Sequence, residues 1–310
     1  MKEDKLFTPA YFESFHCLMG ACPDSCCKAG WEIPIDDETI AKLRTYPKLE
    51  IDKNICPGSD GDTVLRVNDN EICPYLTHDG LCEMYIQSGM MGDVCSKHPR
   101  FYEEYYTGDE IAFTEAGISV SCPEAARIVL SASRSDYDSL SKVQTDDDLL
   151  NFLLSAREKA FDIPSSQLIA YGELLQEEID FCTFELPGHE LTDSEPIDMP
   201  SLCDFILTKT EILTPEWRKL LESCGQGSFG NIPKPQKQAL LWYLIFRFFL
   251  KAVNTEDILT ECKLIVALYE LCISLSEING DFTETVRLAS KELEHDDFNL
   301  DLLRDYLSQS

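Results

Sequence analysis

The chain has 310 residues, enough for one large domain or two ordinary ones, so its hydrophobic core needs no covalent reinforcement. Its formal net charge of −30 and its pI near 4.4 argue against a nucleic-acid partner, because there is no basic field, and are compatible with a basic or lysine-bearing partner. Residues 1–15 lack the apolar segment and cleavage site of a secretory signal, so we expect a cytoplasmic protein without a dense disulfide framework.

Frequent Cys, Pro, Gly and Asp in the first 130 residues predict short segments separated by turns. A short helix is expected over 35–46, with Asp36 or Asp37 as its N-cap and Pro47 ending it. Residues 61–76 predict a small β-hairpin that turns at the Asn-Asp-Asn of 68–70. Cys122 precedes a proline and an apolar stripe, so we expect it to cap a helix whose dipole lowers the pKa of the thiol.

The remainder of the chain predicts helices. Two capped apolar runs cover 145–161 and 165–181, and a polar, proline-bearing linker follows at 186–200. Further helices are expected over 201–224, 236–253 and 256–278, with a shorter pair near the end. The run at 239–253 is the most apolar, but it is too short to span a bilayer and contains an arginine, so we expect a core helix and no membrane contact.

The expected fold is therefore mostly α. A Cys-rich, loop-dominated N-terminal lobe with a small β-hairpin, residues 1–135, packs on an α-helical C-terminal lobe, residues 136–310.

Cysteines are concentrated in the first of these lobes. Of the 14 in the chain, nine lie before residue 123: Cys17, Cys22, Cys26, Cys27, Cys56, Cys73, Cys82, Cys95 and Cys122. Cysteines grouped closely in sequence and followed by further cysteines much later in the chain are typical of a metal site, because folding brings the distant ligands together. Cys56 is the member that fits this pattern least. The other five, at 182, 203, 224, 262 and 272, are expected to be small buried hydrophobic residues.

Without Cys56, eight candidate ligands remain, which exceeds the four thiolates of one zinc ion or one iron–sulfur cluster. Two metal sites, or one site with spare thiols, fit the count. No pair of CxxC knuckles is present, and the irregular spacing favours a cluster over zinc. Neighbouring side chains usually point apart, so Cys26 and Cys27 are not expected to bind the same ion.

Four motifs connect the chain to a known family: FHCLMGACPDSCCKAGWEIPID from residue 15, ICPYLTHDGLCEMY from 72, VCSKHPRFYEE from 94 and SVSCPEAARIVL from 119. In this order they resemble the flagellin lysine-N-methylase family and, more broadly, CxxCxxCC-type zinc- or iron-chelating proteins. The resemblance covers residues 7–130 closely and the helical remainder only in general character.

The resemblance implies a protein lysine N-methyltransferase that uses S-adenosylmethionine, contains a 4Fe–4S cluster and acts on flagellin; zinc is the alternative metal. Carried over by position, the metal ligands lie among the eight cysteines Cys17, Cys22, Cys26, Cys27, Cys73, Cys82, Cys95 and Cys122.

A lysine nucleophile must lose its proton before it attacks, because its ordinary pKa is near 10.4. The motifs contain groups that would assist: Tyr75, Tyr85, His98, Tyr102 and Glu124. For each, core packing or a local hydrogen bond is the alternative role.

Three further motif residues are candidates for binding the methyl donor. Arg100 and Arg127 would hold its carboxylate, or would pair with acids such as Asp93 and Glu124. Trp31 would stack on its adenine, or pack beneath the metal site.

The chain lacks the glycine-rich turn of ordinary methyltransferases, so any S-adenosylmethionine site must be built differently. Two other functions stay open. One is a non-catalytic module that binds zinc or iron, and the other is a structural zinc protein whose helical lobe binds a partner.

Overall fold

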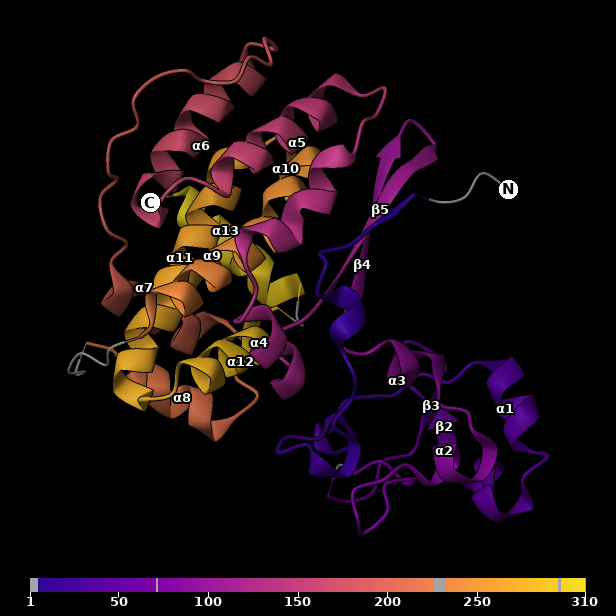
Figure 1. Ribbon diagram of the computed structural model, residues 1–310. Helices are drawn as coiled ribbons and strands as arrows, with labels where there is room; N and C mark the ends of the chain where they lie inside the picture. Colours follow the sequence, from indigo (N-terminus) through magenta and orange to yellow (C-terminus); the bar gives the residue numbers. More distant parts are fainter. Residues whose placement is uncertain (1–4, 71, 226–231, 295–296, 310) are drawn as a thin grey trace.

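The computed structural model describes residues 5–70, 72–225, 232–294 and 297–309. The chain forms two lobes (Figure 1), a small Cys-rich lobe of residues 16–99 and a large helical lobe that contains the remaining described residues. The fold is mostly α, as predicted. Among the described residues, no helix combines the length and the apolar character that crossing a membrane requires.

The Cys-rich lobe has little regular structure. Its elements are α1 (Asp37–Leu43), α2 (Glu83–Ser88), α3 (Asp93–Lys97), β2 (Ile55–Pro57) and β3 (Thr63–Leu65), and several 3-10 turns precede β2. The predicted cap of α1 is confirmed: the Asp36 carboxylate accepts a hydrogen bond from the Thr39 N–H at 2.7 Å. The helix ends at Leu43, four residues before Pro47.

The hairpin of this lobe is not where the sequence predicts it. Strand β3 pairs antiparallel with β2, which precedes it in the chain. Residues 68–70 do make a turn, because the Asn68 side chain accepts hydrogen bonds from the N–H groups of Asn70 and Ile72. The predicted return strand at 71–76 is wrong over 72–76, where the chain instead turns towards α2; Glu71 lies outside the described residues.

A three-stranded sheet leads from the Cys-rich lobe into the helical lobe. Strand β5 (Glu110–Ile118) lies between β4 (Arg100–Thr107), to which it is antiparallel, and the short parallel strand β1 (Leu6–Phe7). The sequence analysis did not anticipate this sheet. Gly117 of β5 has the Phe101 and Phe246 rings against it, and a Cβ there would lie 2.4 Å from Phe101 Cζ.

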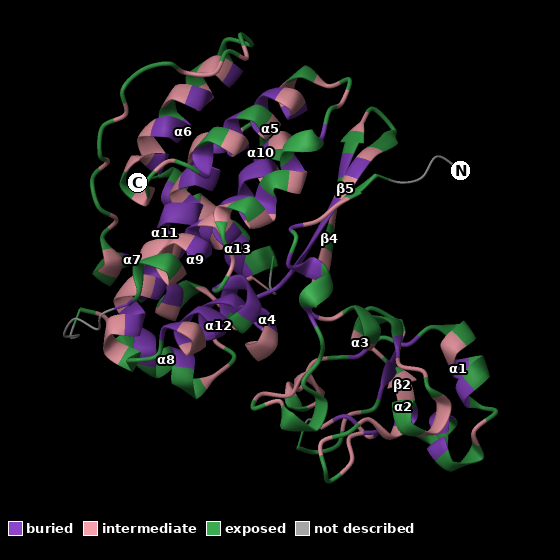
Figure 2. Ribbon diagram, in the orientation of Figure 1, coloured by how far each residue is buried: buried purple, intermediate pink, exposed green. Residues whose placement is uncertain are grey.

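The helical lobe is built from ten α-helices among the described residues. They are α4 (Pro123–Val129), α5 (Asp148–Ala160), α6 (Ser165–Asp180), α7 (Met199–Lys209), α8 (Pro215–Glu222), α9 (Lys234–Phe248), α10 (Ala252–Thr255), α11 (Ile258–Asn279), α12 (Phe282–Leu293) and α13 (Asp297–Ser308). Helix α11 is central and packs on α6, α9, α12 and α13, so much of it is buried (Figure 2).

Most predicted helices are present, with differences at their ends. Asp147 caps α5 as expected, whereas α6 begins after Pro164 with no side-chain cap. The single helix predicted over 201–224 is two, because Thr214 caps a new helix whose first residue is Pro215. The polar linker is confirmed as irregular chain up to Asp198.

The buried apolar side chains form two separate cores. The smaller contains residues between Ile33 and Met84, and the larger joins the helices to the aromatic residues of 11–15 and to the sheet. Strands β1, β4 and β5 and helix α4 therefore pack with the helices, although they precede residue 136. The division into domains at residue 135 stays a prediction, and it does not coincide with this division of the packing.

Candidate metal centre

The opening cysteines lie on a series of tight turns. Two 3-10 turns, Met19–Ala21 and Cys26–Lys28, shape the segment, and Ser25 caps the second by accepting a hydrogen bond from the Cys27 N–H at 3.3 Å. Gly20 lies against the loop of residues 79–81, where a Cβ would come within 2.6 Å of the Asp79 carbonyl oxygen. This close approach brings the first motif next to the second.

Four of the predicted ligands border the small core, and we call them the inner thiol group: Cys27, Cys73, Cys82 and Cys95. The Cys73 N–H donates a hydrogen bond to the Cys27 carbonyl at 2.9 Å. Cys82 forms a β-bridge with Leu76, and Cys95 lies in α3. Cysteines that lie between 9 and 68 positions apart in the sequence are thereby placed around one core.

The thiols of the inner group influence one another. Burial raises the pKa of Cys95 to about 12, and the charges of the other three thiolates add to the increase. Burial likewise raises the pKa of Cys73 to about 11, with smaller effects of the same sign from Cys27 and Cys82. Neighbouring thiolates disfavour each other's ionisation, so a cation that neutralises them would relieve both the repulsion and the cost of burial.

The other four predicted ligands form the outer thiol group: Cys17, Cys22, Cys26 and Cys122. Burial raises the pKa of Cys122, and the nearby charges of Cys22 and Cys17 raise it too. Cys122 is the N-cap of α4, as predicted, but the expected lowering of its pKa is wrong. Burial of the thiol outweighs the effect of the Ala125 and Glu124 amides, which act to lower the pKa.

The adjacent Cys26 and Cys27 lie where the two groups meet. Their thiols hydrogen-bond to each other, which lowers the pKa of Cys27 to about 6 and raises that of Cys26. Beyond this bond, Cys27 interacts with the inner group, whereas Cys26 interacts with Cys17 as well as with Cys95. Cys27 therefore lies among the inner thiols, and Cys26 lies near members of both groups; that the two do not bind the same ion stays a prediction.

All 14 cysteines are free thiols. Within the described ranges, no three Cys, His, Asp or Glu side chains lie close enough together to hold a metal ion. The predicted ligands thus fit a thiophilic metal in residue type and in number, but their spacing is wider than metal coordination requires. Cys56, which fits the ligand pattern least, belongs to neither group and lies on β2.

Trp31 and His98 lie beside the junction of the two groups. The Trp31 indole donates a hydrogen bond to the Cys26 carbonyl at 3.1 Å, and its ring packs edge-on against His98, with 5.6 Å between the ring centres. Burial lowers the pKa of His98, so its imidazole is neutral at pH 7. The contacts of Trp31 with Cys26 and His98 are packing contacts beside the cysteines, and stacking on the adenine of a methyl donor stays a prediction.

The two arginines have protein partners. Arg100 lies over the Phe12 and Phe15 rings, with its guanidinium carbon 5.3 and 5.2 Å from their centres. Arg127 makes a bidentate ion pair with Glu124 at 2.6 and 2.8 Å, and this contact lowers the pKa of the Glu124 carboxyl. Glu124 is therefore ionised and already paired, which leaves it poorly suited to remove a proton from lysine.

The tyrosine candidates differ in exposure. Tyr75 is buried and donates its hydroxyl to the Leu49 carbonyl at 3.0 Å, which is a packing role. Tyr85 and Tyr102 are exposed on α2 and β4.

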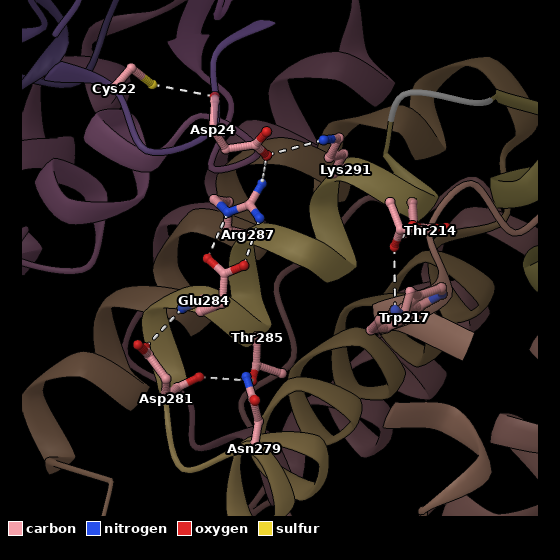
Figure 3. Close-up of polar contacts among 11 residues, drawn as sticks. Cys22, Asp24, Thr214, Trp217, Asn279, Asp281, Glu284, Thr285, Arg287 and Lys291 are labelled. Atoms are coloured by element: carbon pink, nitrogen blue, oxygen red, sulfur yellow. Dashed lines mark hydrogen bonds and ion pairs between the residues drawn. The ribbon is translucent and has the colours of Figure 1, made fainter. Parts of the chain in front are cut away.

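Sequence analysis missed the residues that attach the outer thiol group to the helical lobe (Figure 3). The Asp24 carboxylate binds Arg287 at 2.5 Å and Lys291 at 3.0 Å, both on α12, and the Cys22 thiol donates to the Asp24 carbonyl at 3.3 Å. Burial opposes ionisation of Asp24, but these two cations hold its pKa below the usual value. Arg287 and Lys291 are two basic residues one helical turn apart in a strongly acidic chain, and this pattern could have predicted an acidic partner for them.

No protein-family model, no curated protein and no solved structure matches this chain. The resemblance described above therefore depends on its four sequence motifs alone.

Proposed function

We propose that this chain is an iron–sulfur-containing protein lysine N-methyltransferase that uses S-adenosylmethionine, with flagellin as its substrate. The observation that carries the proposal is the gathering of eight predicted ligands, from four separated motifs, into two adjacent thiol groups. Isolated structural cysteines have no reason to collect in this way. The identity of the reaction and of the substrate comes from the resemblance of the motifs.

The inner thiol group supplies four thiolates, which is the number that one cluster or one zinc ion takes. An iron–sulfur cluster bound there would supply redox-active iron in a partly dehydrated setting. The protein contributes the small core beneath the thiols and the backbone bond between Cys73 and Cys27, which fix two ligands relative to each other.

Among the candidate bases, His98 has the protonation state that the reaction needs. A neutral imidazole accepts a proton from the lysine ammonium, whereas an ion-paired carboxylate such as Glu124 is a poor acceptor. A donor carboxylate would have to displace Glu124 from Arg127, because that arginine is already bound in a bidentate pair.

The first test is purification without oxygen. We expect a brown protein that contains iron and acid-labile sulfide. Cys27→Ser should lose most of the iron, and Cys56→Ser, which changes a cysteine outside both groups, should keep it. A colourless protein that holds only zinc contradicts the cluster, and equal loss in both variants contradicts the assignment of ligands.

The second test concerns catalysis. Calorimetry should detect S-adenosylmethionine binding, and flagellin should gain methyl groups on lysine at a rate that falls as salt screens the acidic surface. A protein that holds metal but neither binds the donor nor methylates flagellin is instead a non-catalytic metal-binding module. The free thiols support this second candidate as well as the first, because they supply metal ligands without requiring a catalytic reaction.

A further inference from the structure

Two cysteines far from the candidate metal centre lie side by side in the helical lobe. Cys203 is on α7 and is 2% exposed, and Cys224 follows the end of α8 and is half-buried. Helices α7 and α8 pack against each other. Cys203 belongs to the large core and Cys224 packs against it, and Cys224 is near enough to raise the pKa of the Cys203 thiol, so the two side chains are neighbours.

The position of Cys224 is set by its backbone and by its contact with α7. Its N–H donates to the Leu221 carbonyl at 3.0 Å, and Gly225, with φ of +80°, ends the turn. Its thiol donates to the Met199 carbonyl at 3.7 Å. Met199 and Cys203 are four residues apart on one helix and lie on the same face, which places the Cys224 sulfur along the face that carries Cys203.

We propose that Cys203 and Cys224 are a dithiol that low-molecular-weight disulfides oxidise to a disulfide joining α7 to the end of α8. This site is independent of the proposed methyltransferase function. It also differs from the other cysteines of the lobe: Cys262 and Cys272 lie buried in α11, and Cys182 is exposed.

The chemistry begins at Cys224, because it is the more accessible thiol. Its thiolate attacks one sulfur of a disulfide such as oxidised glutathione, and one glutathione leaves as a thiolate. The Cys203 thiol then attacks the Cys224 sulfur of the mixed disulfide, and the second glutathione leaves. The two cysteines lose two protons and two electrons, and the reagent becomes two reduced thiols. Burial and Cys224 both raise the pKa of Cys203, so this thiol loses its proton only as it attacks, and the departing glutathione thiolate takes that proton.

The test uses the full chain with Cys182→Ser, because no Lys or Arg separates residue 182 from 203 and trypsin would leave both cysteines in one peptide. The protein is treated with oxidised glutathione, its remaining thiols are alkylated under denaturing conditions, and it is digested with trypsin. Cleavage after Lys209 and Lys219 separates Cys203 from Cys224 unless a disulfide joins them.

We expect the two peptides to stay joined until they are reduced, and the oxidised protein to unfold at a temperature roughly 5 °C higher. Cys224→Ser in the same background should show neither effect, and Cys272 should be recovered as an alkylated thiol in both. Recovery of Cys224 as a glutathione adduct beside an unmodified Cys203 would overturn the proposal, as would a Cys203 joined to any other cysteine.

Discussion

The two lobes place the same residue type in opposite environments. In the helical lobe, Cys262 and Cys272 are fully or almost fully buried among apolar side chains of the large core. In the Cys-rich lobe, most thiols are half-buried at the border of a small core and lie near other thiols. Cysteine acts as a small hydrophobic residue in the first setting, and in the second it has the neighbours that metal binding needs.

The lobes also differ in how they are stabilised. The helical lobe has a large apolar core and a buried ion pair, whereas the Cys-rich lobe has few apolar residues and short elements held by turns and backbone contacts. A small core rarely stabilises a lobe by itself, and a metal is a common remedy. Three substitutions and one change of pH would show how far each lobe depends on its own set of interactions.

The largest effect should come from the buried ion pair of the helical lobe. Glu115 on β5 and Arg157 on α5 are each 2% exposed and make two hydrogen bonds of 2.6 and 2.8 Å. Glu115→Gln leaves the arginine charge buried without its counter-ion, so we expect a loss of about 3–5 kcal/mol in the free energy of unfolding. Chemical denaturation measures it.

The control is Asp52→Asn, which breaks the exposed ion pair with Arg44 and should leave the denaturation curve unchanged. Similar curves for the two variants would contradict the idea that the helical lobe depends on its buried interactions.

The second effect belongs to the Cys-rich lobe. In Gly20→Ala, the new methyl group would meet the Asp79 carbonyl oxygen at 2.6 Å and push apart the loops that carry Cys17 and Cys82. We expect a loss of about 1–3 kcal/mol, with faster amide hydrogen exchange in this lobe and lower metal content. Gly188→Ala is the matched control, because its methyl group meets open space. Exchange that rises equally in both lobes would show that they are not separate.

The third effect concerns the attachment of one lobe to the other. Asp24→Asn removes the charge that Arg287 and Lys291 bind on α12, and we expect a loss of about 1–2 kcal/mol together with faster alkylation of Cys22. Glu284→Gln also removes a partner of Arg287, but only within α12, so it should leave Cys22 alkylation unchanged. Equal alkylation rates in the two variants would contradict this role of Asp24.

The smallest effect is a pH dependence of the same attachment. The cations on α12 lower the pKa of Asp24 in the folded protein, so its stabilisation is complete above the ordinary value near 4 and is lost as the pH falls through the lowered value. The difference in unfolding free energy between the parent and Asp24→Asn should therefore shrink below about pH 4. A difference that stays constant down to pH 2 would contradict it.

Local patterns were sufficient for most helices and for the choice of candidate ligands. The Asp36 and Asp147 caps, and Cys122 before Pro123, are statements about neighbouring residues, and the structure places each as expected. Strand pairing was harder to predict. A strand such as Thr63–Leu65 can pair with the segment before it or with the segment after it in the chain. In the folded protein it pairs with β2, and Leu65 joins the small core.

The sequence by itself determined that the chain is mostly helical and that its cysteines concentrate in the first 122 residues. The tertiary structure decided which thiols are neighbours, that Asp24 binds α12, and that Cys203 meets Cys224. The reason is physical: caps and helical periodicity depend on residues a few positions apart, whereas these contacts join segments that meet only when the cores form.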